Sequence, residues 1–145
     1  MKFSKTTEYS LRILSYMANG SSNLYNASEL NEKLSIPLRY MRKQLTQLVK
    51  KGLLKSIQGK HGGYMIAKSS NEITLWDIVT ATEDLQQTHE CIFGFEDCVF
   101  GKSCSLHSKW NKVQDVYEAM LKSTTLEELK NCRTTRFGIQ TININ

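Results

Sequence analysis

Three cysteines and one histidine lie close together in a stretch that matches neither helical nor strand periodicity. They are Cys91, Cys98, Cys104 and His107, with the spacing C-x6-C-x5-C-x2-H, and they include most of the chain's 4 cysteines and one of its 3 histidines. Thiolate and imidazole groups are the ligands of zinc sites, and thiolates hold most iron–sulfur clusters. The residue types therefore indicate a metal or redox site in an irregular loop.

The residues alone leave zinc and an iron–sulfur cluster equally supported as the occupant of this cysteine segment. A Cys₃His zinc site is chemically reasonable, although zinc sites usually begin with a paired C-x-x-C-type knuckle that is missing here. In a reducing compartment a disulfide could act only as a switch. Three inert cysteines buried in a core would require a core periodicity that the segment lacks. An iron–sulfur cluster suits widely spaced cysteines in a glycine-containing loop. Apolar neighbours could shield such a cluster from water, namely Ile92, Phe93, Phe95, Val99 and Phe100.

The overall composition is typical of a soluble globular chain. The protein has 145 residues, of which 40% are hydrophobic and 23% charged, enough for one domain or one small domain with an oligomerisation element. No apolar run approaches the ~18 residues of a membrane span. The N-terminal segment interrupts its apolar pattern with Glu8 and Arg12, unlike a signal peptide. We therefore expect a cytoplasmic protein with reduced thiols and no membrane partner.

The formal net charge of +5 hides a strong difference between the two halves of the chain. Up to Lys68 the sequence has twelve Lys and Arg against three Glu, about +9, whereas the remainder has seven against eleven, about −4. A basic N-terminal half is typical of an anion-binding module, and nucleic acid is a common partner of such modules. A solvated lysine-rich surface would give the same count, so charge alone does not separate the two.

The first third of the chain predicts three helices. Apolar spacing supports one over residues 3–19, a short one that Asn26 caps with Glu29 three residues later, and a third over residues 38–51 that Gly52 ends. The second and third are joined by about three residues, and the third is basic and rich in amide side chains on one face. Together they form a helix-turn-helix pattern.

A wing and a set of DNA contacts follow from this pattern. After the third helix, the alternating "LLKSIQ", the breaker "GKHGG" and the extended "YMIA" predict a β-hairpin. Arginine pairs bidentately with guanine and glutamine with adenine. Polar side chains early on the third helix are therefore candidates for the major groove: Arg39, Tyr40, Arg42, Lys43 and Gln44. Lys50 and Lys51 would contact phosphates, and the wing tip with Lys60 and His61 would enter the adjacent minor groove.

Helices are also predicted on both sides of the cysteine segment. The stretch "ITLWDIVTATED" forms a short helix that Thr74 caps, a long amphipathic helix covers residues 108–122, and Thr125 caps a last short helix. The long helix has one apolar stripe, composed of Trp110, Val113, Val116, Tyr117, Met120 and Leu121. A Cys104–His107 nucleophile pair is not expected to make the chain an enzyme, because both lie in one loop without an oxyanion-type glycine turn. The expected fold is mainly α with a small β-wing.

Three stretches and the cysteine triplet together resemble the Rrf2 family of bacterial transcription regulators over essentially the whole chain. The stretches are "TTEYSLRIL…YMA", "SIPLRYMRKQLTQLVKKGLLKSIQGKHGGYMIA" and "ITLWDIV". The wing motif G-x-x-G-G-Y, from Gly59 to Tyr64, is the most specific part beside the cysteines. The resemblance implies a winged helix-turn-helix joined to a long C-terminal dimerisation helix, and a homodimer that binds palindromic DNA. The expected parts are a DNA-binding domain (1–84), a cluster loop (85–107), the dimerisation and short C-terminal helices (108–135) and a tail (136–145).

The resemblance also favours an iron–sulfur cluster, of the 2Fe–2S or 4Fe–4S type, over zinc. It implies Cys91, Cys98 and Cys104 as ligands, with His107 as the fourth, as in the iron–sulfur-biogenesis branch of the family. Glu8 of the partner subunit is the alternative fourth ligand, since the nitric-oxide-sensing branch uses a carboxylate there. A non-cysteine ligand makes a cluster easier to lose, so we expect it to be absent from aerobically prepared protein.

The function expected from this resemblance is that of a homodimeric repressor whose labile cluster controls operator affinity in response to redox, nitric oxide or iron–sulfur status. The apolar stripe of the long helix would form the dimer interface. A zinc- or thiol-switch regulator without a cluster is the alternative. Family wings usually carry an arginine where this chain has Gln58, so Lys60 or His61 would replace the minor-groove contact, or the preferred operator would differ. Gln58 itself is a further candidate DNA contact of the wing. Cys132 is expected to be a structural or free thiol.

Overall fold

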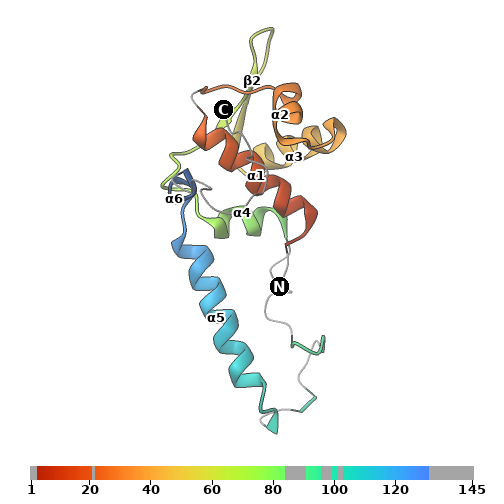
Figure 1. The fold of residues 1–145 in the computed structure, drawn as a ribbon, viewed down its shortest axis with the longest axis vertical. Coiled ribbons are helices and arrows are strands. Elements are labelled where there is room, and N and C mark those ends of the chain that lie inside the picture. The colour runs from red at the N-terminus through yellow and green to blue at the C-terminus, as the bar shows by residue number, and fades with distance from the viewer. Residues whose placement is uncertain (1–2, 21, 84–90, 96–98, 101–102, 131–145) are drawn as a thin grey trace, which may run out of the picture.

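The computed structural model describes residues 3–20, 22–83, 91–95, 99–100 and 103–130. Helices dominate, and a two-stranded antiparallel sheet forms the hairpin at one end of the molecule (Figure 1). The elements are α1 (Lys5–Asn19), α2 (Ala27–Leu34), α3 (Leu38–Lys50), β1 (Leu54–Ile57), β2 (Gly63–Ile66), α4 (Leu75–Thr82), α5 (His107–Ser123) and α6 (Leu126–Lys130). This arrangement confirms the predicted mainly α fold with a small β-wing. The predicted tail and Cys132 lie outside the described residues.

Local side-chain chemistry fixes where the first helices begin. The side chain of Ser4 accepts a hydrogen bond from the Thr7 backbone N–H at the start of α1. Asn26 Oδ1 accepts from Glu29 N at 2.8 Å at the start of α2, as the sequence predicts. The backbone then turns through Ser35, whose φ of 52° is left-handed, and Pro37 precedes the first residue of α3.

The core of the N-terminal half forms where α1, α2 and α3 bury their apolar faces against one another. Each fully buried aliphatic side chain contributes about 1.5–3 kcal/mol relative to its exposure in water. The fully buried members include Ile13, Leu14, Leu30, Met41, Leu45 and Leu48. Because α3 uses this face for the core, its opposite face is left in solvent.

The wing is held to the helices by backbone pairing. Leu54 pairs with Ile66 and Ile57 with Gly63 in the antiparallel register of β1 and β2. Tyr25 and Tyr64 exchange backbone N–H···O bonds of 2.9 and 2.7 Å, which join the hairpin to the α1–α2 connection. A Cβ at Gly63 would lie 2.6 Å from the Tyr25 carbonyl oxygen, so glycine is required for this close approach.

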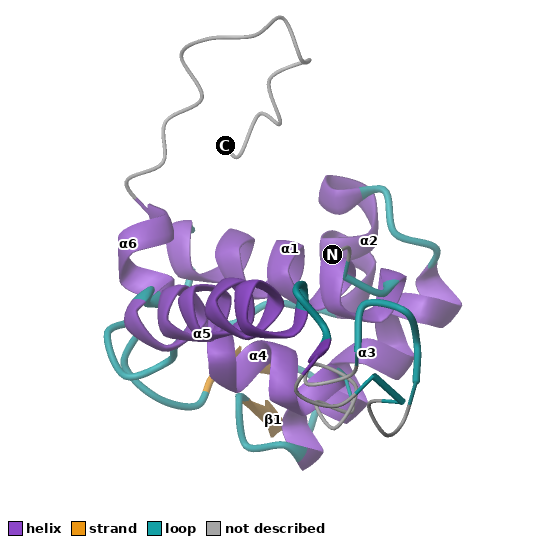
Figure 2. Cartoon of the chain, turned by 90° about the horizontal axis from the view of Figure 1, so that it is seen from below, coloured by secondary structure: helices purple, strands orange, loops and turns teal. Residues whose placement is uncertain are grey.

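The C-terminal elements attach to the body at two places, α5 on α4 and α6 on α1. A complete capping box between Thr74 and Asp77 starts α4, and α4 packs on both α1 and α5 (Figure 2). The backbone N–H of Leu75 donates to Thr124 O at 2.9 Å, and that of Leu126 donates to Ile73 O at 2.7 Å. These bonds hold the end of α5 and the start of α6, while the other end of α5 extends away from the body, farthest from the wing (Figure 1).

Replacing Gly63 by alanine should destabilise the wing, because the added Cβ collides with backbone rather than with a flexible side chain. We expect Gly63→Ala to lower the free energy of unfolding by about 2 kcal/mol in a urea titration. Ser56→Ala is the matched control, since Ser56 is exposed and faces Tyr64 across the hairpin. If the loss of unfolding free energy for Gly63→Ala lay within about 0.5 kcal/mol of that for Ser56→Ala, the role of this close approach would be contradicted.

Candidate nucleic-acid interface and cysteine segment

The outer face of α3 is exposed and cationic. Arg39, Arg42, Lys43 and Lys50 lie on it, and none of them forms an ion pair with a carboxylate of the described residues. Tyr40 is 54% exposed, which leaves its ring available for apolar contact. A positive surface without internal neutralisation attracts a polyanion, and an α-helix fits the major groove of DNA.

A shallow groove of about 420 Å³ runs along this face. It is lined by Arg42, Lys43, Thr46, Gln47 and Lys50. Thr46 and Gln47 are additional candidates that the sequence assigned to the polar face without a DNA contact. Their positions three or four residues beyond Arg42 and Lys43, one helical turn along the same face, are the signal that could have identified them.

Gln44 is wrongly predicted as a base contact. Its side chain is only 2% exposed, and the Ser10 hydroxyl donates a hydrogen bond to Gln44 Oε1 at 3.3 Å. Gln44 follows Met41 by three residues and precedes Leu48 by four, a spacing that places it on the buried stripe of α3. From this position it faces α1, away from the groove face.

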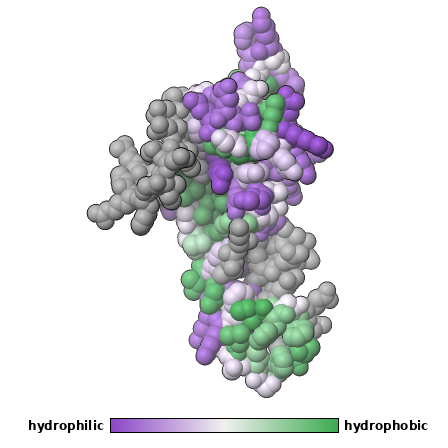
Figure 3. All heavy atoms as spheres, turned by 45° about the vertical axis from the view of Figure 1, so that its right-hand side comes forward, coloured by the Kyte–Doolittle hydropathy of each residue, from purple (hydrophilic) through white to green (hydrophobic). Residues whose placement is uncertain are grey.

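The wing tip also presents polar side chains to solvent. Gln58, Lys60 and His61 are all exposed around the turn, where Gly59 adopts a φ of +110° that other residues rarely adopt. Lys51 is exposed at the end of α3. Hydrophilic atoms cover this end of the molecule, whereas hydrophobic atoms gather at the opposite end (Figure 3). The distribution separates a hydrophilic end from an apolar end.

The cysteine segment is described only in part, and Cys98 lies outside the described residues. Cys91 and Cys104 are half-buried free thiols. His107 is the exposed first residue of α5, with its Nε2 atom 3.2 Å from Asn111 Nδ2. Within the part of the chain that the structure describes, no three His, Cys, Asp or Glu side chains gather closely enough to hold a metal ion. The described thiols and His107 therefore do not by themselves assemble the predicted ligand set.

Aromatic side chains of the cysteine segment cluster in solvent. The Phe93 and Phe100 rings lie 6.3 Å apart between centroids, and those of Phe95 and Phe100 lie 6.2 Å apart. All three rings remain exposed, between 39% and 60%. Ile92 and Val99 are also exposed. Exposed aromatic clusters of this kind are typical of contact surfaces.

A carboxylate joins the residues before the cysteine segment to α1. Glu83 Oε1 accepts from the Ser4 backbone N–H and from the Thr7 hydroxyl, both at 2.7 Å. Its negative charge at the start of α1 also complements the helix dipole. On α5, burial and the charge of Glu83 raise the pKa of Tyr117, and the Tyr117 ring lies 6.3 Å from that of Phe3. The start of α1 and the end of α4 therefore meet beside α5.

Glu8, the alternative cluster ligand, lies on α1 just after Thr7. Its carboxylate forms an ion pair with Lys5 on the same helix. The side chain is partly exposed, at 22%. Use of this carboxylate as a ligand would require its ion pair with Lys5 to be broken.

The long helix α5 has two apolar faces with different surroundings. Val113, Val116 and Met120 share one face and are 45%, 71% and 48% exposed, whereas Trp110 and Tyr117 are half-buried. Leu121 is wrongly predicted as part of an intermolecular contact, because it is fully buried within the single chain. The single apolar stripe of the sequence therefore divides into an intramolecular and an exposed portion.

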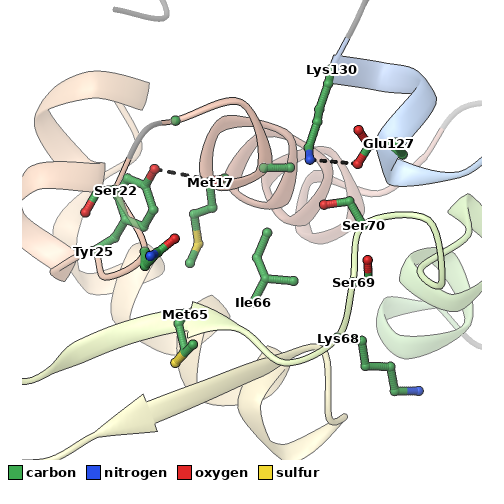
Figure 4. Close-up of a pocket in the computed structure, with 13 residues that line it drawn as sticks. Met17, Ser22, Tyr25, Met65, Ile66, Lys68, Ser69, Ser70, Glu127 and Lys130 are labelled. Carbon is green, nitrogen blue, oxygen red and sulfur yellow. Dashed lines mark hydrogen bonds and ion pairs between the residues drawn. The ribbon is translucent and has the colours of Figure 1, made fainter.

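A second, polar groove of about 330 Å³ lies between the end of α1, β2 and α6 (Figure 4). The Tyr25 hydroxyl donates to Met17 O at 3.4 Å on one side of it. Lys130 and Glu127 pair at 2.7 Å on the other side, within α6. The groove marks where the base of the wing and α6 meet the same end of α1.

The helix-turn-helix, the wing and the unneutralised basic face define the class of protein as a winged-helix DNA-binding protein. The chain belongs to the Rrf2 family, described as iron-dependent transcriptional regulators, whose family model matches residues 3–131. None of the described helices is long and apolar enough to cross a membrane.

Individual relatives agree with this assignment. The chain is 30% identical over 131 residues to the HTH-type transcriptional regulator NsrR of Bacillus licheniformis, covering 89% of this chain and 92% of that one. It is 33% identical over 104 residues to the regulator IscR of Pectobacterium carotovorum, covering 72% of this chain and 63% of the relative. Among solved structures it is similar to CymR, the global cysteine regulator of B. subtilis, with a TM-score of 0.74, 26% identity and coverage of 90% and 96%. These relatives are regulators and not enzymes, as the sequence predicts.

Arg42 and Lys51 should make different contributions to DNA binding. Arg42→Ala, on the groove face, should weaken binding to a specific operator by about 1–3 kcal/mol and relax base preference. Lys51→Ala should weaken binding to all duplexes similarly, because a phosphate contact carries no sequence information. It should also reduce the slope of log affinity against log salt concentration by about 1. Fluorescence anisotropy with operator and scrambled duplexes at several salt concentrations measures both. Equal losses for the two variants on scrambled DNA would remove Arg42 from a reading role.

Proposed function

We propose that the protein is a homodimeric repressor of transcription in the cytoplasm that binds a palindromic operator through α3 and the wing. The observation that carries this proposal is the exposed cationic face of α3, without acidic partners in the described residues, together with the exposed polar side chains of the wing tip. Arg39, Arg42 and Lys43 contact base edges in the proposed complex, and Lys50 and Lys51 contact phosphates. Gln58, Lys60 and His61 of the wing approach the minor groove.

The proposed dimer forms along α5. Val113, Val116 and Met120 would leave apolar surface in water in a monomer, and burial against the same face of a second copy removes it. Trp110, half-buried near the start of the helix, would extend the contact. Two-fold symmetry then presents two α3 helices to successive major grooves, about 34 Å apart, which matches a palindromic site.

The proposed signal is the assembly or loss of an iron–sulfur cluster. Its ligands would be Cys91, Cys98 and Cys104, with His107 or the partner subunit's Glu8 as the fourth. The supports are the cysteine spacing and the family's description as iron-dependent. When bound, a cluster supplies a redox-active centre that oxidants and nitric oxide can modify.

The residues of the chain that would pass this signal to DNA are those beside the cysteine segment. Glu83 stands directly before residues 84–90 and bonds to the start of α1, whose other residues pack on α3. A change in the cysteine segment could therefore move α1 and α3 of one subunit relative to the other, and shift the population of DNA-competent dimers.

A thiol switch without a cluster is the second candidate. Cys91 and Cys104 are free thiols that are half-buried and not sealed in the core, so they are accessible to oxidants. The similarity to a structure described as a global cysteine regulator favours considering this chemistry. Zinc held by the same residues is a further form of this alternative.

Placing a charge on the exposed face of α5 should separate the subunits. Val116→Lys is expected to convert a dimer to a monomer in analytical ultracentrifugation, because lysine would bring an unpaired charge into the apolar contact. Asp115→Lys is the matched control, since Asp115 is exposed and lies about 100° further round the helix. Unchanged sedimentation of Val116→Lys would exclude this face as the dimer interface.

Anaerobic purification distinguishes the cluster from its alternatives. The proposed protein should be brown and contain iron and sulfide, whereas a zinc form would be colourless and a thiol switch free of metal. Replacing Cys91, Cys98 and Cys104 together by alanine should abolish the colour and make operator affinity independent of oxidant. If the triple variant and the wild type bind the operator identically under all redox conditions, the cysteines do not control DNA binding.

A further inference from the structure

The recognition helix α3 has few directional contacts with the rest of the chain. Its N-cap residue, Pro37, provides no side-chain capping bond. Its buried side chains Met41, Leu45 and Leu48 pack through apolar contacts, which are non-directional, and methionine in particular adapts its shape to its surroundings. Apolar packing specifies one helix orientation less strictly than a satisfied buried polar contact does.

The buried hydrogen bond between Ser10 and Gln44 is the exception. Ser10 is fully buried on α1 and Gln44 is 2% exposed on α3, with the hydroxyl donating to Oε1 at 3.3 Å. The other side-chain bond from α3 to a different element among the described residues, from Gln47 Nε2 to Ala81 O, is longer at 3.5 Å and only partly buried. The bond forms in one arrangement only, and a shifted helix would deprive the buried Gln44 amide oxygen of this donor.

We propose that Gln44 is a positioning residue for operator recognition, and that its bond to Ser10 fixes the rotation and register of α3 on α1. Gln44 directly follows Arg42 and Lys43 in the chain, so any rotation that breaks the bond also turns these two side chains away from their base edges. The inference rests on the proposed DNA-reading function of α3. It assigns to Gln44 a role in specificity without any contact with DNA.

The test compares operator and scrambled duplexes with Gln44→Leu, which keeps the size of the side chain and removes its polar group. The operator is the duplex that wild-type protein enriches from a random library. Gln44→Leu should lower the ratio of operator affinity to scrambled-duplex affinity about tenfold, while scrambled-duplex affinity and its salt dependence change less than about twofold. Ser10→Ala, which removes the other partner, should lower the ratio in the same direction.

Two further variants separate positioning from stability. Met41→Leu alters apolar packing in the same helix without touching the polar pair, and should keep the wild-type ratio even where the melting temperature changes. Combining Ser10→Ala with Gln44→Leu leaves no unpaired polar group, so folding should recover while the ratio stays low. This double variant also provides the test if Gln44→Leu alone fails to fold.

The outcomes are distinct. The positioning role of Gln44 would be overturned if the folded double variant kept the wild-type ratio of operator to scrambled-duplex affinity. It would also be overturned if Met41→Leu lowered this ratio as much as Gln44→Leu does. Either result would leave DNA recognition by α3 intact. A wild-type protein that enriches no sequence from the library would instead overturn the proposed function, and this inference with it.

Discussion

The packing of α3 on α1 is the contact on which the rest of the structure depends. One face of α3 supplies Met41, Leu45 and Leu48 to the core, and this burial determines that the opposite, cationic face is presented to solvent. The wing reinforces the same arrangement, because its pairing with Tyr25 ties the hairpin to the chain that enters α2. A helix without an acidic partner on its basic face is stable here because the core, and not charge pairing, holds it.

The second organising feature is the meeting of α1, α4 and α5 beside the cysteine segment. Glu83 bonds to the start of α1, and Tyr117 of α5 lies close enough for the charge of Glu83 to raise its pKa. The described chain before residues 84–90 therefore ends, at Glu83, at a point attached to the helix that supports α3. The exposed face of α5 begins on the other side of the cysteine segment. This position, between a DNA-binding core and a candidate dimer surface, is what makes the segment suitable for regulation.

Much of this could be predicted from the sequence, because local chemistry determines it. The caps at Asn26 and Thr74, the helix periodicity and the glycines of the wing are local signals, and the structure follows them. The sequence predicts a DNA contact for Gln44 and a dimer contact for Leu121, and both side chains are instead buried within the chain. Burial depends on which neighbour a helix face meets. Gln44 has the spacing of the buried stripe but a polar side chain, and Leu121 belongs to an apolar stripe whose partner, within the chain or in a second copy, spacing does not identify. The ligand set of the cysteine segment is harder still, since irregular loops lack periodicity and ligand assembly can depend on the bound group or on a second subunit.

Hydroxyl-radical footprinting of the protein on its enriched operator tests the central claim most directly, because it maps the DNA positions that both subunits protect. The account predicts two protected half-sites with inverted sequence, on one side of the duplex, with centres one helical turn or a whole number of turns apart. A single half-site, or protection spread evenly along the duplex without a two-fold centre, would contradict a dimer that reads DNA through two α3 helices.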